Sequence, residues 1–167
     1  LITMGGVDQS NATGQVLQAL KAWTLPKDSR ISVVMGLRAP WVKQVRAQAQ
    51  DMLWPTEVLV NISDMAQRMA DSDLAIGAAG STSWERCCLG LPTLMVVLAD
   101  NQRAIAEALQ DAGAANTLDI ASDVPMKCEV LSSNPRILHD MSISAARIVD
   151  GLGTAKLVSH FSELKNL

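Results

Sequence analysis

Short apolar segments alternate with amphipathic segments along most of this chain, and this alternation constrains the fold more than any other feature. The run Ile31–Met35 is apolar in the way that is typical of a strand buried on both faces of a sheet. Similar short segments predict further strands at residues 1–4, 57–60, 73–76 and 93–98. Because glycine, proline or a polar cluster follows each of them, we expect short strands that end abruptly.

Segments with helical spacing separate these strands. In the first of them Val16, Leu17 and Leu20 recur on one helix face. Helices are predicted at residues 11–23, 41–53, 63–70, with Ser63 as the N-cap, 81–89 and 102–112. Strands that alternate with helices of this size indicate βαβ units with right-handed crossovers. The sequence therefore predicts an α/β fold with a doubly wound, Rossmann-like parallel sheet.

The end of the chain differs, because the strand signal fades after about Asp119. Asn134 followed by Pro135 is a good helix start, and residues 142–149 and 154–164 also have helical spacing. Gly151 and Gly153 predict a break between the last two segments. With 167 residues and no linker-like tract, the whole chain 1–167 is expected to form one domain.

Charge and composition exclude several classes of partner. The formal net charge is −3 and there is no basic cluster, so neither a nucleic acid nor an anionic membrane is expected as a partner. No apolar run is long enough to predict a membrane span. Cys87, Cys88 and Cys128 do not have the spacing of a disulfide framework or a zinc site. They are expected to pack as thiols in a reducing cytoplasm.

In a parallel sheet, ligands bind beyond the carboxyl ends of the strands, so the loops at those ends are the candidate sites. The first is Gly5-Gly6-Val7-Asp8-Gln9-Ser10-Asn11. The paired glycines Gly5 and Gly6 permit a tight turn and close backbone approach to a ligand. A plain turn followed by an Asn11 helix cap explains the same residues, and the sequence leaves both interpretations open.

The segment from Gly77 to Glu85 carries the clearest signal of chemistry. Small residues lead into a helix start, where free N–H groups and the helix dipole favour phosphate. Gly80 allows close approach, and Ser81 and Thr82 add hydroxyl donors. Glu85 is placed to accept hydrogen bonds from ribose hydroxyls, as carboxylates do in dinucleotide-binding folds. Thr82 and Glu85 also have the spacing of a capping box, which remains an equal alternative.

Two further loops are weaker candidates. Asp100-Asn101-Gln102 follows a strand and precedes a helix, which a simple N-cap would also explain. The loop that ends at Met65 offers backbone groups for a base, or is an ordinary connection. His139 and His160 have no cysteine or carboxylate at metal-ligand spacing, so no metal site is expected at either. No cofactor is expected. Trp23, Trp41 and Trp54 are expected to pack.

Taken together, these segments resemble a known family. The run AIGAAGSTSWERCCLGLP at residues 75–92 is similar to the signature of the UDP-sugar hydrolases of pseudaminic acid biosynthesis. Residues 3–8 (TMGGVD), 64–70 (DMAQRMA), 98–102 (LADNQ) and 150–153 (DGLG) resemble the same family. The similarity covers nearly the whole chain.

The resemblance implies that the chain is the C-terminal, nucleotide-binding half of a GT-B fold. That family is related to the UDP-GlcNAc transferase of peptidoglycan synthesis and releases UDP from a diacetamido-trideoxy-hexose with inversion, without a metal. It implies that Gly80, Ser81 and Thr82 hold the diphosphate and that Glu85 holds the ribose. It also implies that the Met65 loop contacts the uracil, and that Asn101, followed by Gln102, lies in the active site. The catalytic histidine would lie in an N-terminal domain that this chain lacks.

Two other functions remain open at this stage. A glycosyltransferase of the same fold would move the sugar to an acceptor instead of water, and its nucleotide-binding half would look almost the same. A sugar-nucleotide-binding module without chemistry would also retain these loops. Because the chain starts at Leu1, inside an expected strand, we expect further sequence before it, and that sequence would separate the three.

Overall fold

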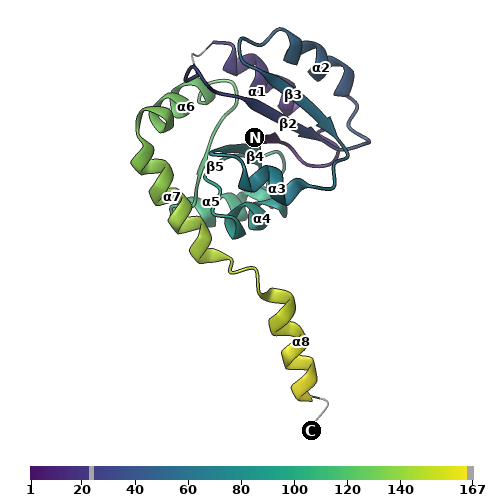
Figure 1. Cartoon of the computed structure of the whole chain (residues 1–167), viewed down its shortest axis with the longest axis vertical. Coiled ribbons are helices and arrows are strands. Elements are labelled where there is room, and N and C mark those ends of the chain that lie inside the picture. The colour runs from purple at the N-terminus through teal and green to yellow at the C-terminus, as the bar shows by residue number, and fades with distance from the viewer. Residues whose placement is uncertain (23–24, 165–167) are drawn as a thin grey trace.

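A six-stranded parallel sheet forms the centre of the molecule (Figure 1). The computed structural model describes residues 1–22 and 25–164. The strands lie in the order β3-β2-β1-β4-β5-β6, which confirms the doubly wound, Rossmann-like prediction. They are β1 (Ile2–Thr3), β2 (Ile31–Met35), β3 (Thr56–Val60), β4 (Ala75–Ala78), β5 (Thr93–Val96) and β6 (Ala115–Thr117). Strands β1 and β4 are parallel neighbours, and the order in which successive strands join the sheet reverses between them, so their carboxyl ends flank the switch point.

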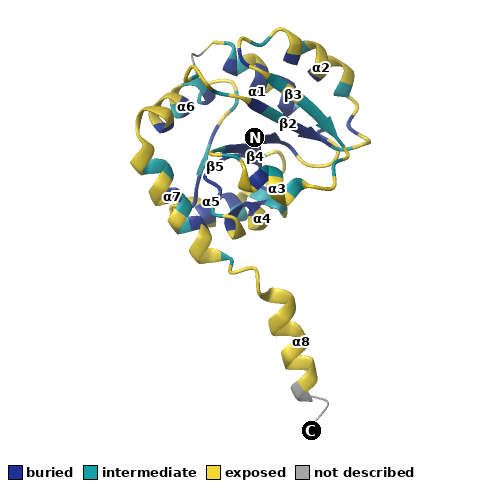
Figure 2. Cartoon of the chain, in the orientation of Figure 1, coloured by how far each residue is buried: buried dark blue, intermediate teal, exposed yellow. Residues whose placement is uncertain are grey.

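Helices cover both faces of the sheet. Val16, Leu17 and Leu20 of the first helix are buried on one face, as their spacing predicts. That face carries α1 (Ala12–Leu20), α2 (Val42–Gln50) and α6 (Val124–Ser133). The other carries α3 (Met65–Ala70), α4 (Thr82–Cys88) and α5 (Arg103–Asp111), with α7 (Pro135–Ile148) packed against α4. In Figure 2 the strands are mostly buried and the outer helix surfaces exposed.

The structure corrects several predicted boundaries. Strand β4 runs two residues further than predicted, through Gly77 and Ala78, because these small residues pair with β5. Strand β6 and helix α6 lie where the sequence signal fades, since β6 is short and α6 has little amphipathic spacing. The predicted helix 142–149 is the second half of α7, which begins at Pro135 as expected. Trp23 lies outside the described residues.

The predicted helix ends are confirmed at two glycines and wrong at one cap. Gly90 and Gly113 follow α4 and α5 with positive φ angles, the conformation that ends helices at glycine. The N-cap position of α3 is Asp64 rather than Ser63, and the Asp64 side chain makes no capping hydrogen bond. Asp64 instead pairs with Arg68 one turn later, at 3.1 Å.

The last helix, α8 (Gly153–Leu164), extends away from the rest of the fold (Figure 1). Residues 153–162 are all exposed, including the large apolar side chains of Leu157, Val158 and Phe161. The break before this helix is confirmed, with Gly151 at a φ of 71°. No helix in the described ranges has both the length and the apolar character needed to cross a membrane.

Candidate functional site

The predicted site residues gather at the carboxyl ends of neighbouring strands. Because β1, β4 and β5 are adjacent in the sheet, the loops that follow them lie side by side at the switch point. Gly5 and Gly6 follow β1, Gly80 follows β4, and Asn101 follows β5. Met65 begins α3 after the edge strand β3. These loops differ in what their backbone groups can still bind.

The loop after β1 closes the N-terminus of α1 with its own side chains. Asp8 is buried, and its carboxylate accepts hydrogen bonds from the N–H groups of Ala12 at 2.8 Å and Thr13 at 3.0 Å. Asn11 adopts a left-handed conformation and accepts a hydrogen bond from the Gly14 N–H at 3.2 Å, so the Asn11 cap is confirmed. The donors of this helix start are therefore occupied, and the Asp8 charge disfavours an anion there.

Gly5 and Gly6 differ in how the fold constrains them. Gly5 has a φ of 86°, a conformation that other residues rarely adopt. The carbonyl of Gly6 occupies the space that a Cβ on Gly36 would need, so this loop packs on the chain after β2. Both Gly5 and Gly6 are exposed, with open space where a side chain would begin. Contact between these two residues and a nucleotide stays a prediction.

The loop after β4 presents free donors. The described part of the chain contains no hydrogen bond that uses the N–H groups of Gly80, Ser81 or Thr82. Ser81 occupies the N-cap position of α4 and is exposed, and its side chain makes no capping bond. Three consecutive N–H groups at the carboxyl edge of the sheet are thus free to bind a ligand. Because Gly80 has no side chain, a bulky ligand can approach them closely.

Glu85 does not form the capping box with Thr82 that the sequence left open as an alternative. Because Ser81 and not Thr82 stands at the N-cap, Glu85 lies one position too late in α4 for a capping box. Its side chain is exposed and forms no hydrogen bond or ion pair with any residue that the structure describes. The capping alternative is therefore wrong, and the ribose role stays a prediction.

Arg86 is a residue that the sequence reading missed. Its side chain is 1% exposed, and Nη2 donates to the Ala78 carbonyl at 2.8 Å and to Ser83 Oγ at 3.0 Å. Burial lowers the pKa of the Arg86 guanidinium to about 10, partly offset by the nearby Cys87 and Glu85. The guanidinium therefore remains charged at neutral pH. Only its position before an apolar stretch of α4 could have singled it out in the sequence.

The segment after β5 approaches the β4 loop. It forms a short turn, η1 (Asp100–Gln102), and the Gln102 side chain accepts a hydrogen bond from the Leu98 N–H at 2.9 Å. A Cβ on Gly80 would lie 4.0 Å from Gln102 Nε2, so these two predicted residues are neighbours. Neither end of this segment makes a side-chain cap, so the simple N-cap interpretation is wrong. Asn101 is exposed.

Met65 is partly buried and packs with a small apolar cluster that includes Met69, Ala75 and Leu91. This packing gives the side chain a structural role. The preceding loop contains Asn61 in a left-handed conformation, and the Asn61 N–H bonds to the Met35 carbonyl at 3.1 Å. Contact between this loop and a base stays a prediction.

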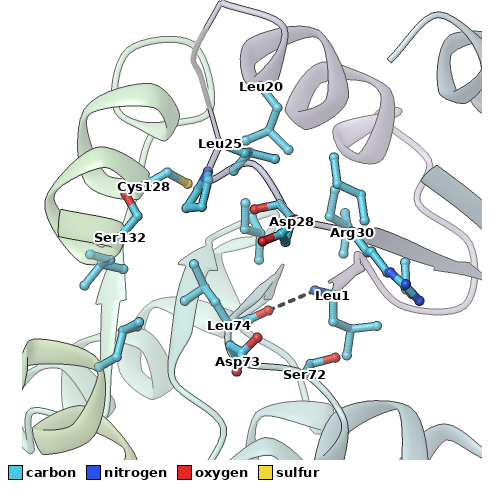
Figure 3. A pocket seen from close by; sticks show the side chains of 18 of the residues that line it. Leu1, Leu20, Leu25, Asp28, Arg30, Ser72, Asp73, Leu74, Cys128 and Ser132 are labelled. Atoms are coloured by element: carbon cyan, nitrogen blue, oxygen red, sulfur yellow. Dashed lines mark hydrogen bonds between the residues drawn. The ribbon is translucent and has the colours of Figure 1, made fainter. Parts of the chain in front are cut away.

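A cavity of about 600 Å³ lies at the opposite edge of the sheet, by the amino ends of β1, β2 and β4 (Figure 3). Leu1, Arg30, Asp73 and Leu74 line it, and the Leu1 nitrogen donates to the Leu74 carbonyl at 2.9 Å. Parallel sheets bind ligands at their carboxyl ends, where the free donors lie. We therefore assign the candidate site to the β1, β4 and β5 loops, not to this cavity.

The remaining predictions concern metals, thiols and tryptophans. Among the described residues, no three His, Cys, Asp or Glu side chains are arranged to hold a metal. Cys87 and Cys128 are buried, and burial raises the pKa of both thiols, that of Cys128 to about 11. Cys88 is exposed, contrary to the expected packing. Trp54 is buried and Trp41 is half-buried, as predicted.

The chain is similar to known proteins over most of its length. The model of the glycosyltransferase family 28 C-terminal domain matches residues 1–127. The spore coat polysaccharide biosynthesis protein SpsG of Bacillus subtilis (strain 168) is 28% identical over 170 residues, covering 98% of this chain and 50% of that protein.

Two further proteins are similar to this chain, one in sequence and one in structure. The UDP-N-acetylglucosamine--N-acetylmuramyl-(pentapeptide) pyrophosphoryl-undecaprenol N-acetylglucosamine transferase of Phenylobacterium zucineum (strain HLK1) is 30% identical over 164 residues, covering 89% of this chain and 43% of that protein. The crystal structure of Acinetobacter baumannii MurG superposes with a TM-score of 0.75 at 23% identity, covering 97% of this chain and 49% of that one. The fold matches the C-terminal half of GT-B glycosyltransferases. The chain spans half or less of the length of these proteins.

Proposed function

Because this chain belongs to the family of glycosyltransferase family 28 C-terminal domains, we propose that it holds the UDP of a UDP-sugar in an enzyme that cleaves the sugar–diphosphate bond. One observation carries the proposal. At the switch point, the β4 loop offers three free N–H groups, whereas the β1 loop is closed by the Asp8 carboxylate. A diphosphate is therefore bound by Gly80, Ser81 and Thr82 rather than at α1.

The other parts of the nucleotide follow from this position. Glu85 is exposed about one turn beyond the N-terminus of α4 and accepts hydrogen bonds from the ribose hydroxyls. The loop before Met65 contacts the uracil, and Gly5 and Gly6 border the nucleotide on the β1 side. Gln102, beside Gly80, reaches the phosphates, and the exposed Asn101 contacts the reacting end of the sugar.

This half of the enzyme stabilises the leaving group. When the bond between the anomeric carbon and the diphosphate breaks, negative charge builds up on the departing phosphate oxygen. N–H donors fixed in position at the β4 loop stabilise that charge without a metal ion. The attacking group and its base come from the second half of the protein. This division is supported by relatives about twice as long as this chain.

Water is the acceptor in the activity we favour. The hydrolase proposal rests on the resemblance of residues 75–92 to the UDP-sugar hydrolases of pseudaminic acid biosynthesis, and the substrate is then a UDP-linked diacetamido-trideoxy-hexose. The second candidate is a glycosyltransferase, which is favoured by the 30% identity to a UDP-N-acetylglucosamine-using transferase. A nucleotide-sugar-binding module without chemistry is the third.

The exposed apolar residues of α8 fit the two-half arrangement. Leu157 and Phe161 lie four residues apart on one helix face, and Val158 is adjacent. Exposing these apolar side chains to water is unfavourable, and no other element within the described residues covers them. We assign it to the preceding half of the same protein, which is the partner that this function requires.

One assay separates the three activities. The whole protein is incubated with UDP-sugars, with and without candidate acceptors, and UDP and free sugar are both measured. A hydrolase releases UDP and free sugar without an acceptor, a transferase requires the acceptor, and a binding module releases neither. The 167-residue chain alone should bind UDP, without magnesium, and should not turn over. Substantial turnover by this chain alone would contradict the division of labour.

A further inference from the structure

The buried arginine of α4 has no counter-ion among the described residues. No carboxylate there lies within ion-pair distance of Arg86, although every nitrogen of its guanidinium is enclosed by protein. Its Nε is buried without any hydrogen-bond partner. Burying an uncompensated charge is strongly unfavourable. The presence of Arg86 at this position therefore points to a role other than stabilising the fold.

We infer that Arg86 is a positioning residue for the diphosphate: its guanidinium fixes the loop between β4 and α4 and supplies the positive charge behind it. This inference rests on the proposed function, and it adds a residue that does not itself touch the ligand. The class of ligand is a nucleoside diphosphate, since the charge matters for phosphate and not for the base or ribose.

The contacts of Arg86 define its structural part. Nη2 bonds at once to the carbonyl of Ala78, the last residue of β4, and to the hydroxyl of Ser83, in the first turn of α4. Between these two anchors lie residues 79–82, which include the three free N–H groups. One buried group therefore ties together both ends of the loop that presents the donors.

The charge of Arg86 defines its electrostatic part. The guanidinium lies beside Gly77, where a Cβ would be 2.7 Å from Nη1, and it bonds to Ala78, so it sits at the end of β4 where the loop begins. A positive charge in a low-dielectric interior acts strongly on an anion outside it. Across the switch point, the Asp8 carboxylate gives the β1 loop the opposite charge. The two loops thus direct an anion to the β4 side.

The test compares UDP with uridine, because only UDP carries the diphosphate. Affinities for both are measured by calorimetry on the whole protein carrying Arg86→Met, Arg86→Lys or Arg46→Met. Arg46 is an exposed arginine of α2 and serves as the charge-matched control. We expect Arg86→Met to lower the ratio of UDP to uridine affinity about ten-fold or more. Arg86→Lys should restore part of that ratio, and Arg46→Met should leave it unchanged.

The outcomes separate this inference from the proposed function. If the unsubstituted protein binds no UDP, the proposed function fails and this inference with it. If UDP binds but Arg86→Met lowers the affinities for UDP and uridine equally, or lowers neither, Arg86 has only a structural role and the inference alone is overturned. Should Arg86→Met not fold, Ser83→Ala removes one anchor and keeps the charge. It should lower the same ratio about three-fold, and an unchanged ratio would overturn the inference.

Discussion

The guanidinium of Arg86 fills the space that a side chain at Gly77 would need, since a Cβ on Gly77 would lie 2.7 Å from Nη1. The same Cβ would also lie 3.0 Å from the carbonyl oxygen of Thr3, on the neighbouring strand. The guanidinium is itself held by Ala78 and Ser83, so it has little freedom to move aside. The glycine in β4 and the arginine in α4 are therefore coupled.

Replacing Gly77 with alanine should destabilise the protein by about 1–3 kcal/mol, because the added methyl group overpacks a buried site. Chemical denaturation measures this change. Gly153→Ala is the matched control, because a Cβ there meets nothing within 4 Å. The UDP affinity of the Gly77→Ala protein should also fall, since the substitution displaces Arg86. Equal stability of the two variants would show that the Arg86 side chain moves aside without cost, and would contradict the coupling of Gly77 and Arg86.

Glu85 should affect ligand binding without affecting stability. It is exposed and forms no capping box, so Glu85→Ala should change the free energy of unfolding by less than about 0.5 kcal/mol. Glu85→Gln should lower UDP affinity about ten-fold, because charge-assisted hydrogen bonds to the ribose are lost. Calorimetry with UDP and thermal unfolding test both parts. Unchanged UDP binding together with reduced stability would return Glu85 to a structural role.

Asp8 should show the opposite behaviour. Its carboxylate accepts hydrogen bonds from Ala12 and Thr13 at the start of α1, so Asp8→Ala should cost about 1–2 kcal/mol of stability. Asp28→Ala removes an exposed carboxylate and is the control. UDP affinity of the folded Asp8→Ala protein should not fall. A large loss of UDP binding at full stability would indicate that the phosphates contact the β1 loop.

The fold was predictable from the sequence because its signals are local. Continuous apolar runs such as Ile31–Met35 and glycine stops such as Gly90 identify strands and helix ends without knowledge of their neighbours. Strand β6 has only the residues Ala115–Thr117 and depends on its pairing with β5, so no local pattern reveals it.

The candidate site was predictable as a set of loops but not as an electrostatic arrangement. The glycines and hydroxyls after β4 are recognisable in sequence. The roles of Asp8 and Arg86 depend on burial and on contacts between elements, and in the sequence these residues stand out only as members of the runs 3–8 and 75–92 that carry the family resemblance. The capping-box interpretation is wrong because α4 begins one residue earlier than that motif requires, which puts Glu85 one position past the capping-box position.

The pH dependence of UDP binding should follow Arg86. Its pKa is lowered by burial to about 10, so binding that depends on its charge is present at lower pH and is lost as pH rises through that value. UDP affinity should therefore be constant between about pH 7 and pH 9, above the titration of the phosphate. In the Arg86→Lys protein the UDP affinity should begin to fall at lower pH. Burial lowers the pKa of the lysine ammonium as well, and the pKa of an unperturbed lysine is already below that of an arginine. Identical profiles for the two proteins would contradict this account.

The position of the diphosphate is the central claim, and a crystal structure of the protein with UDP tests it most directly. Phosphate oxygens should lie within hydrogen-bond distance of the N–H groups of Gly80, Ser81 and Thr82, and Glu85 should contact the ribose hydroxyls. Arg86 should lie behind the loop without touching the ligand. Phosphates bound at the start of α1, or in the cavity beside Leu1 and Leu74, would contradict it.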